Sequence, residues 1–133
     1  MTGELLYLDS SAIVKLISPE PETKGLTDRL ASRQPVTSSV ISRVEVRRAV
    51  RRLGDNRLSR QAEAVLSRIA LIHLLEATID EASSLDPPEL RSLDAIHLAT
   101  AISLRESLDA FITYDRGLTS AAKRHGVQAE SPR

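Results

Sequence analysis

The sequence has 133 residues, which is the length of one compact domain, and 41% of them are hydrophobic, which is enough for one core. It contains no cysteine, and this excludes disulfides, thiolate metal sites and cysteine nucleophiles. The formal net charge is zero, unlike the strongly basic surface of a general nucleic-acid binder.

The chain shows neither a signal-like start nor a membrane span. Its first apolar run, residues 5–8, has the length of a strand, and no run approaches the roughly 20 apolar residues of a transmembrane helix. A chain without cysteine also suits a reducing compartment. We therefore expect a cytoplasmic protein with one domain over residues 1–133 and no membrane partner.

Short apolar runs alternate with amphipathic segments. In chain order we expect strand 5–8, helix 10–17 capped by Ser10 or Ser11, helix 20–32, strand 35–37, helix 39–53, helix 58–69, strand 71–75, helix 77–85, helix 92–107 capped by Ser92, strand 110–113, helix 118–124 and a short edge strand after Gly126 and Val127. This alternation favours an α/β fold in which helices cover both faces of a parallel sheet. Functional sites in such sheets form beyond the carboxyl ends of the strands.

Four acidic side chains are candidates for that edge. Asp9 and Asp115 directly follow expected strands, Asp94 lies in the first turn of an expected helix, and Glu45 lies between two valines, which suggests partial burial. Clustered carboxylates repel one another unless protons or cations neutralise them. Hard divalent ions such as Mg²⁺ prefer oxygen ligands, and they can activate water and offset charge on a phosphodiester.

Each acid also has an ordinary structural explanation. Asp9 alone can be a helix cap, Asp94 a residue that complements the helix dipole, and Asp115 a turn residue before Gly117. Asp109 serves as a control, because a strand separates it from Asp115 by roughly 20 Å. We expect Asp109 to lie outside any such cluster.

The basic residues are unevenly distributed. Residues 40–68 contain eight arginines and only three acids. Arg47 and Arg48 in this stretch, and Arg116 directly after Asp115, are candidates for contacts with phosphate groups. A solvated helix face, or a surface that meets a partner protein, explains the same arginines.

Four segments together resemble the PIN-domain family. They read LYLDSSAIVKL around Asp9, SSVISRVEVRRAV around Glu45, LRSLDAIHLATA around Asp94 and DAFITYDRGL around Asp115. Their order, their spacing and the chain length resemble the VapC subgroup, the toxins of bacterial and archaeal toxin–antitoxin pairs.

The resemblance implies a three-layer α/β/α fold with a parallel sheet in the order 3-2-1-4-5. It implies an endoribonuclease that depends on Mg²⁺ or Mn²⁺, acts on structured RNA such as tRNA or rRNA, forms a homodimer and pairs with a VapB-like antitoxin. Asp9, Glu45, Asp94 and Asp115 would be its metal-binding and catalytic residues. Ser10 and Thr113 are candidates to hold these carboxylates by hydrogen bonds, and His97 is expected to be a buried structural histidine.

Three alternatives stay open at this point. One is a PIN-fold nuclease that processes RNA, or acts on DNA, outside toxin–antitoxin systems. Another is a PIN fold that binds without cutting. The third is a phosphoacceptor receiver domain, but Asp9 lacks a neighbouring acid and no lysine lies between Lys24 and Lys123, where such a domain needs one.

Overall fold

The computed structural model describes residues 3–133 and contains a five-stranded sheet in which every pair of neighbouring strands is parallel. The strand order is β3-β2-β1-β4-β5, which confirms the predicted order 3-2-1-4-5. The strands are β1 (Leu5–Leu8), β2 (Val36–Ser39), β3 (Ala70–Ile72), β4 (Leu108–Ile112) and β5 (Ala129–Glu130). This order differs from the 2-1-3-4-5 order of receiver domains and so argues against that alternative.

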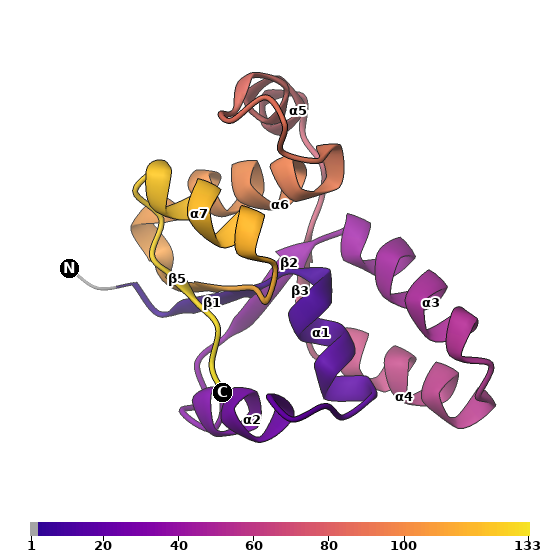
Figure 1. Ribbon diagram of the computed structural model, residues 1–133. Helices are drawn as coiled ribbons and strands as arrows, with labels where there is room; N and C mark the ends of the chain where they lie inside the picture. Colours follow the sequence, from indigo (N-terminus) through magenta and orange to yellow (C-terminus); the bar gives the residue numbers. More distant parts are fainter. Residues whose placement is uncertain (1–2) are drawn as a thin grey trace.

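Helices cover both faces of the sheet, as Figure 1 shows. One side carries α1 (Ser10–Ile17), α2 (Thr23–Leu30), α3 (Ile41–Leu53) and α4 (Asn56–Leu66); the other carries α6 (Ser92–Ser103) and α7 (Arg116–Arg124), with α5 (Glu76–Ser84) packed outside α6. A short 3₁₀ helix, η1 (Arg105–Ser107), leads into β4. The three-layer α/β/α architecture is therefore confirmed. Within residues 3–133, every helix is too short or too polar to cross a bilayer.

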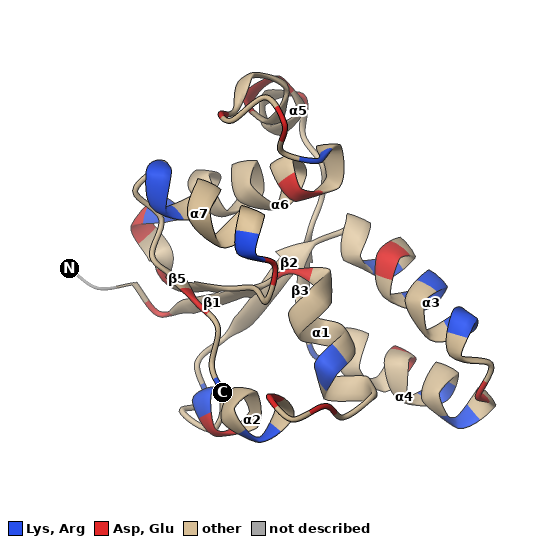
Figure 2. Cartoon of the chain, viewed as in Figure 1, with Lys and Arg blue, Asp and Glu red and all other residues tan. Residues whose placement is uncertain are grey.

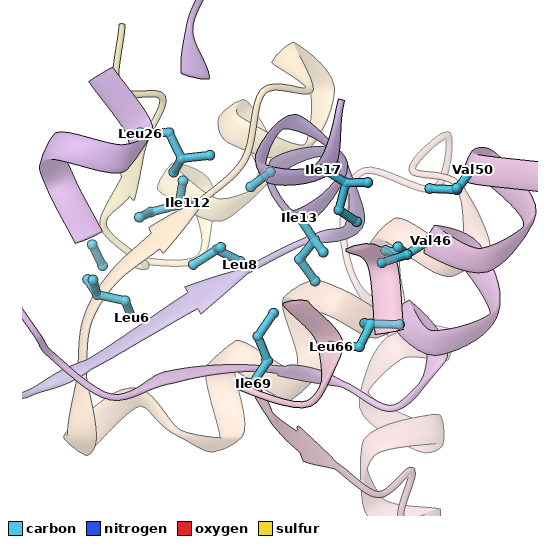
Figure 3. Packing of buried hydrophobic residues seen from close by; sticks show 13 residues of the cluster. Leu6, Leu8, Ile13, Ile17, Leu26, Val46, Val50, Leu66, Ile69 and Ile112 are labelled. Carbon is cyan, nitrogen blue, oxygen red and sulfur yellow. The ribbon is translucent and has the colours of Figure 1, made fainter. Parts of the chain in front are cut away.

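Alternating side chains of the strands form two cores. Leu6, Leu8 and Ile112 point to the side of α1–α4, where they pack with Ile13 and Val46 (Figure 3). The neighbouring positions Tyr7 and Phe111 point to the other side and pack with Leu98 of α6 and Leu118 of α7. Because successive strand residues face opposite sides, a strand that is buried on both faces reads as a continuous apolar run.

Several element boundaries differ from the sequence-based expectation. Helix α2 begins at Thr23 and not at residue 20, because Glu20 precedes Pro21, and a residue before proline disfavours the helical conformation. Helix α6 ends at Ser103, and β4 begins at Leu108. The expected cap Ser92 lies inside α6, whose N-cap is Arg91 without a side-chain hydrogen bond.

The turns after β1 and β4 carry the two aspartates and begin helices. Asp9 is the N-cap of α1, where its Oδ1 accepts a hydrogen bond from Ala12 N at 3.0 Å. Asp115 is the N-cap of α7, where its Oδ1 accepts from Leu118 N at 2.8 Å. The expectation that Ser10 or Ser11 caps α1 is therefore wrong. Both aspartates lie at the carboxyl edge of the sheet because β1 and β4 are neighbouring parallel strands.

Candidate active site

Four carboxylates from four elements come together at the carboxyl edge of the sheet. We call Asp9, Glu45, Asp94 and Asp115 the acidic cluster. In Figure 2 acidic segments mark α3, the start of α6 and the turn before α7 around this edge. Burial raises the pKa of Asp94, and the negative charges of Asp115, Asp9 and Glu45 raise it further, so the other three carboxylates lie within electrostatic reach of Asp94.

Three of the four acids lie at helix N-termini. Asp9 and Asp115 cap α1 and α7, and Asp94 lies in the first turn of α6. The positive end of a helix dipole stabilises a nearby negative charge, typically by about 0.3–1 kcal/mol. Asp9 and Asp115 therefore do act as helix caps, a role that the sequence suggested for Asp9. Because the N-termini of α1, α6 and α7 lie at the same edge of the sheet, they also bring three negative charges to that edge.

Asp9 is the buried member of the cluster, with 3% of its surface exposed. Its Oδ1 accepts from Ser11 Oγ at 2.6 Å, and its Oδ2 accepts from Thr113 Oγ1 at 2.5 Å. Burial raises the pKa of Asp9, although the hydrogen bonds from Ser11, Thr113 and Ala12 N oppose the shift. A buried carboxylate of this kind needs fixed partners, and Asp9 has them.

The hydroxyl groups around Asp9 differ in part from the expected ones. Thr113 contacts Asp9 and also accepts a hydrogen bond from Asp115 N at 3.1 Å, so it links two members of the cluster. Ser10 lines the cleft, but among the described residues its hydroxyl makes no hydrogen bond. Ser11, and not Ser10, holds Asp9 by a hydrogen bond, and the hydroxyl of Ser11 also accepts from Tyr114 N at 3.1 Å. Because both serines follow Asp9 in the first turn of α1, the sequence alone did not separate them.

Asp94 shows the electrostatic repulsion within the acidic cluster most directly. Desolvation by burial, followed by the charges of Asp115, Asp9 and Glu45, raises the pKa of Asp94 to about 6. In the part of the chain that the structure describes, neither oxygen of Asp94 accepts a hydrogen bond, and no lysine or arginine forms an ion pair with Asp9, Asp94 or Asp115. A bound cation would relieve this repulsion.

Glu45 reaches the cluster from α3, with 20% of its side chain exposed. Its Oε1 lies 2.7 Å from His97 Nε2, whose ring is fully buried. The prediction that Glu45 is partly buried is confirmed, although only one of the flanking valines is buried: Val46 is at 0% exposure and Val44 at 60%. The reason is the helical period, which turns Ser42, Val46 and Val50 of α3 inward.

Two hollows flank the acidic cluster. The larger one, which we call the cleft, has a volume of about 650 Å³ and is lined by Glu45 and Asp115 together with Lys15, Arg48 and Arg52. A smaller hollow of about 330 Å³ is lined by Asp94, Asp115 and Gly117. Asp115 belongs to both hollows. Asp9 lines neither, and it contacts the cleft through Ser11.

The three candidate arginines differ in whether their side chains line the cleft. Arg48 lines the cleft, together with Arg52 one helical turn later. Arg47 points elsewhere, because its guanidinium forms two hydrogen bonds with Glu63 of α4, at 2.6 and 3.0 Å. Arg116 is exposed at the start of α7 and lines neither hollow. Lys15, which the sequence did not single out, lies in the cleft and is paired with Glu20 and Glu22.

The carboxylate oxygens of the acidic cluster suit a hard divalent ion that keeps part of its water shell. Both oxygens of Asp94, Oδ2 of Asp115 and Oε2 of Glu45 make no hydrogen bond among residues 3–133. In the same residues, no three Asp, Glu or His side chains converge closely enough to enclose an ion by themselves. Mg²⁺ keeps several waters beside a few carboxylates, so a partly hydrated ion fits this arrangement.

Comparison with known proteins agrees with the fold. The PIN domain family model matches residues 6–124. The chain is 42% identical over 127 residues to ribonuclease VapC46 of Mycobacterium tuberculosis (strain ATCC 25618 / H37Rv), and 37% identical over 132 residues to ribonuclease VapC47 of Mycobacterium tuberculosis (strain CDC 1551 / Oshkosh). Each alignment covers 96% of this chain and 97% of the relative.

Solved structures share the fold at lower identity. The crystal structure of Mycobacterium tuberculosis VapC20, described as a sarcin–ricin loop cleaving toxin, superposes with a TM-score of 0.69 at 18% identity, over 87% of this chain and 94% of VapC20. A chain of Rickettsia felis VapBC2, solved bound to a DNA fragment from its promoter, gives a TM-score of 0.69 at 16% identity, over 97% and 99%. The family match and the relatives above 30% identity lead to one conclusion: this chain belongs to the PIN-domain family, among the VapC ribonucleases.

Proposed function

We propose that the acidic cluster is the active site of an endoribonuclease that hydrolyses RNA phosphodiester bonds with Mg²⁺, or Mn²⁺ in its place. The observation that carries the proposal is the uncompensated charge of the cluster: four carboxylates meet at one edge, and among the described residues none of the three aspartates has a cationic side chain as partner. Relatives named ribonuclease VapC support the choice of RNA as substrate.

The four acids would hold the ion, directly or through water. A divalent ion so held supplies Lewis-acid chemistry, by which it activates water and offsets charge on the scissile phosphate. Asp9, fixed by Ser11 and Thr113, offers the most rigid carboxylate, and Asp94 and Asp115 offer the freest oxygens. Glu45 would complete the set, or orient a water for attack.

The cationic side chains of the cleft would bind the RNA backbone. Arg48 and Arg52 lie one helical turn apart, on the same wall of the cleft as Glu45. Arginine forms paired hydrogen bonds with phosphate oxygens, and such contacts position a nucleic acid without reading its sequence. Arg116 stays a candidate contact at the rim, whereas Arg47 is already paired with Glu63 and is the weakest of the three candidates.

The partner that we propose is a VapB-like antitoxin, and we propose that the chain acts as the toxin of such a pair and forms a homodimer. A structural neighbour described as a toxin–antitoxin complex from Klebsiella pneumoniae, with a TM-score of 0.66, and the Rickettsia felis VapBC2 structure support the antitoxin partner. Growth arrest upon expression, relieved by the product of a neighbouring reading frame, would identify the antitoxin. Arrest without any such relief would favour an RNA-processing nuclease.

The direct test is incubation of the purified chain with total RNA, tRNA and rRNA included, with Mg²⁺ or with EDTA, followed by mapping of the new ends. Hydrolysis of the proposed type leaves a 3′-hydroxyl and a 5′-phosphate. We expect such ends with Mg²⁺ and none with EDTA. Cleavage that persists in EDTA, or that leaves 2′,3′-cyclic phosphates, would contradict the proposal.

A further inference from the structure

A buried chain of hydrogen bonds connects the backbone of the sheet to Glu45. Ser39 N donates to Tyr7 Oη at 3.0 Å, Tyr7 Oη lies 2.7 Å from His97 Nδ1, and His97 Nε2 lies 2.7 Å from Glu45 Oε1. Tyr7 and His97 are completely buried. The chain joins β2, β1, α6 and α3, and its outer end is a carboxylate of the acidic cluster.

The directions of these hydrogen bonds follow from counting hydrogens. A backbone N–H can only donate, so the hydroxyl of Tyr7 accepts from Ser39. Nε2 of His97 faces a carboxylate oxygen, which only accepts, so a neutral imidazole carries its one hydrogen at Nε2 and the hydroxyl of Tyr7 donates to Nδ1. Burial raises the pKa of Tyr7, so the phenol keeps this hydrogen. A histidine that accepts at Nδ1 carries its own hydrogen at Nε2. His97 therefore donates to Glu45 Oε1.

Packing holds both rings in place. The ring of Tyr7 stacks on Phe111 with centroids 5.2 Å apart and planes at 21°, and it meets His97 edge-on at 5.8 Å and 80°. A rotation of either ring would leave a buried polar atom without a hydrogen-bond partner, which is unfavourable. The donor that faces Glu45 is therefore rigid.

We propose that His97 is a positioning residue, which holds Oε1 of Glu45 so that Oε2 faces the cation site, with Tyr7 fixing its tautomer. This inference rests on the proposed function and adds two residues to it. A free glutamate side chain loses rotamer entropy when it is fixed. His97 removes part of this loss before the ion binds, so its removal must weaken ion binding while Glu45 itself remains present.

The first test reads the tautomer directly in the metal-free protein. Long-range ¹H–¹⁵N correlation spectra of the full chain distinguish a histidine that is protonated at Nε2 from one protonated at Nδ1. We expect the Nε2–H form for His97, and in Tyr7→Phe we expect a mixture of the two forms because the acceptor at Nδ1 has lost its donor. A wild-type His97 protonated at Nδ1 would overturn the inference, whatever the enzyme does.

The second test measures Mn²⁺ affinity by titration calorimetry in two matched variants. The amide nitrogen of glutamine reaches the position of Nε2, whereas asparagine ends near Nδ1. We expect His97→Asn to weaken Mn²⁺ binding by about 10- to 100-fold, the range seen when a partner of a metal-binding carboxylate is removed, and His97→Gln to restore most of it. His125→Asn removes an imidazole bonded to Asp86 O, outside the cluster, and should change nothing.

Equal Mn²⁺ affinity in wild type and His97→Asn would overturn the inference, as would equal losses in the Asn and Gln variants. If His97→Asn fails to fold, as circular dichroism would reveal, Tyr7→Phe takes its place with a smaller expected loss. A wild-type chain that binds no Mn²⁺ contradicts the proposed function and the inference with it. A chain that binds Mn²⁺ and carries the Nδ1–H tautomer contradicts the inference alone.

Discussion

Two groups of acids at the central sheet differ in how their charge is balanced. Asp109 of β4 and Glu130 of β5 share the guanidinium of Arg29 from α2, at 3.0 and 2.8 Å; we call these three residues the Arg29 cluster. The acidic cluster lies at the carboxyl ends of β1 and β4, and none of its aspartates has such a cation among the described residues. Strand β4 therefore begins near Asp109, whose charge Arg29 neutralises, and it is followed by Asp115, which has no cationic partner among the described residues.

The pKa values express the contrast. Hydrogen bonds from Gln34 and Arg29 lower the pKa of Asp109, whereas burial and the charges of Asp115, Asp9 and Glu45 raise the pKa of Asp94 to about 6. An acid paired with a cation has a lowered pKa and stabilises the fold, whereas an acid with a raised pKa and no cationic partner is typical of a binding site. The placement of Asp109 with Arg29 also confirms that it lies outside the acidic cluster.

The largest expected effect tests the acidic cluster itself. Asp9→Asn should abolish RNA cleavage and Mg²⁺ binding, because it removes one of the carboxylates that we propose as ligands of the ion. The metal-free variant should be as stable as wild type or more stable, because repulsion falls, the amide oxygen can still accept from Ser11 Oγ and Ala12 N, and the amide nitrogen can donate to the hydroxyl of Thr113. Cleavage assays and urea unfolding measure both. A variant that unfolds and yet leaves Mg²⁺ binding intact in the folded fraction would contradict the account.

Cation binding should stabilise the chain only through the acidic cluster. At a Mn²⁺ concentration 100 times its Kd, binding adds about 2.7 kcal/mol to the free energy of unfolding. We expect this gain in wild type and in Asp109→Asn, and none in Asp9→Asn, by urea unfolding with and without Mn²⁺. An equal gain in all three proteins would mean that the ion binds elsewhere.

The raised pKa of Asp94 predicts how the stability of the metal-free protein depends on pH. Its folded pKa of about 6 exceeds the ordinary 3.8, so its contribution to stability is full below pH ~4 and is lost as the pH rises through about 6. The full shift would correspond to roughly 3 kcal/mol, and because the carboxyl is partly exposed and screened we expect about 1–2 kcal/mol. Asp94→Asn should remove this slope in urea midpoints measured from pH 4 to pH 7. An unchanged slope would rule out Asp94 as its source.

The Arg29 cluster should respond in the opposite way. Asp109→Asn removes a half-buried ion pair, so we expect a loss of about 0.5–1 kcal/mol at neutral pH. Because the folded pKa of Asp109 is lowered, the contribution of this carboxylate is present above pH ~4 and is lost as the pH falls below it. RNA cleavage at saturating Mg²⁺ should stay at the wild-type rate, and a large loss of cleavage would break the distinction between the two groups of acids.

The smallest effect separates two neighbouring arginines. Arg48→Ala should raise the KM for RNA, because Arg48 lines the cleft, whereas Arg47→Ala should leave KM and the urea midpoint unchanged, because an exposed pair with Glu63 contributes little. The salt dependence of RNA binding gives a second measure, since the loss of one phosphate contact lowers its slope. Equal effects of the two substitutions would show that the pairing with Glu63 does not persist in the complex.

Local patterns in the sequence determined the strands, the helices and the placement of three acids. An apolar run that ends in an aspartate predicts a buried strand with the acid at its carboxyl end, and this reasoning placed Asp9 and Asp115. It also placed Asp94 in the first turn of its helix. These conclusions needed only the period of the side chains and the rule that parallel strands end at a common edge.

Contacts between distant segments were decided by the tertiary structure alone. Arg47 and Arg48 are neighbours with the same side chain, and only the packing of α4 against α3 gives Glu63 to Arg47 and leaves Arg48 in the cleft. His97 lies 52 residues from Glu45 and 90 from Tyr7, so no local pattern showed that its two nitrogens join them. Periodicity says which side of an element a residue occupies, whereas its partner across the core depends on how the layers stack.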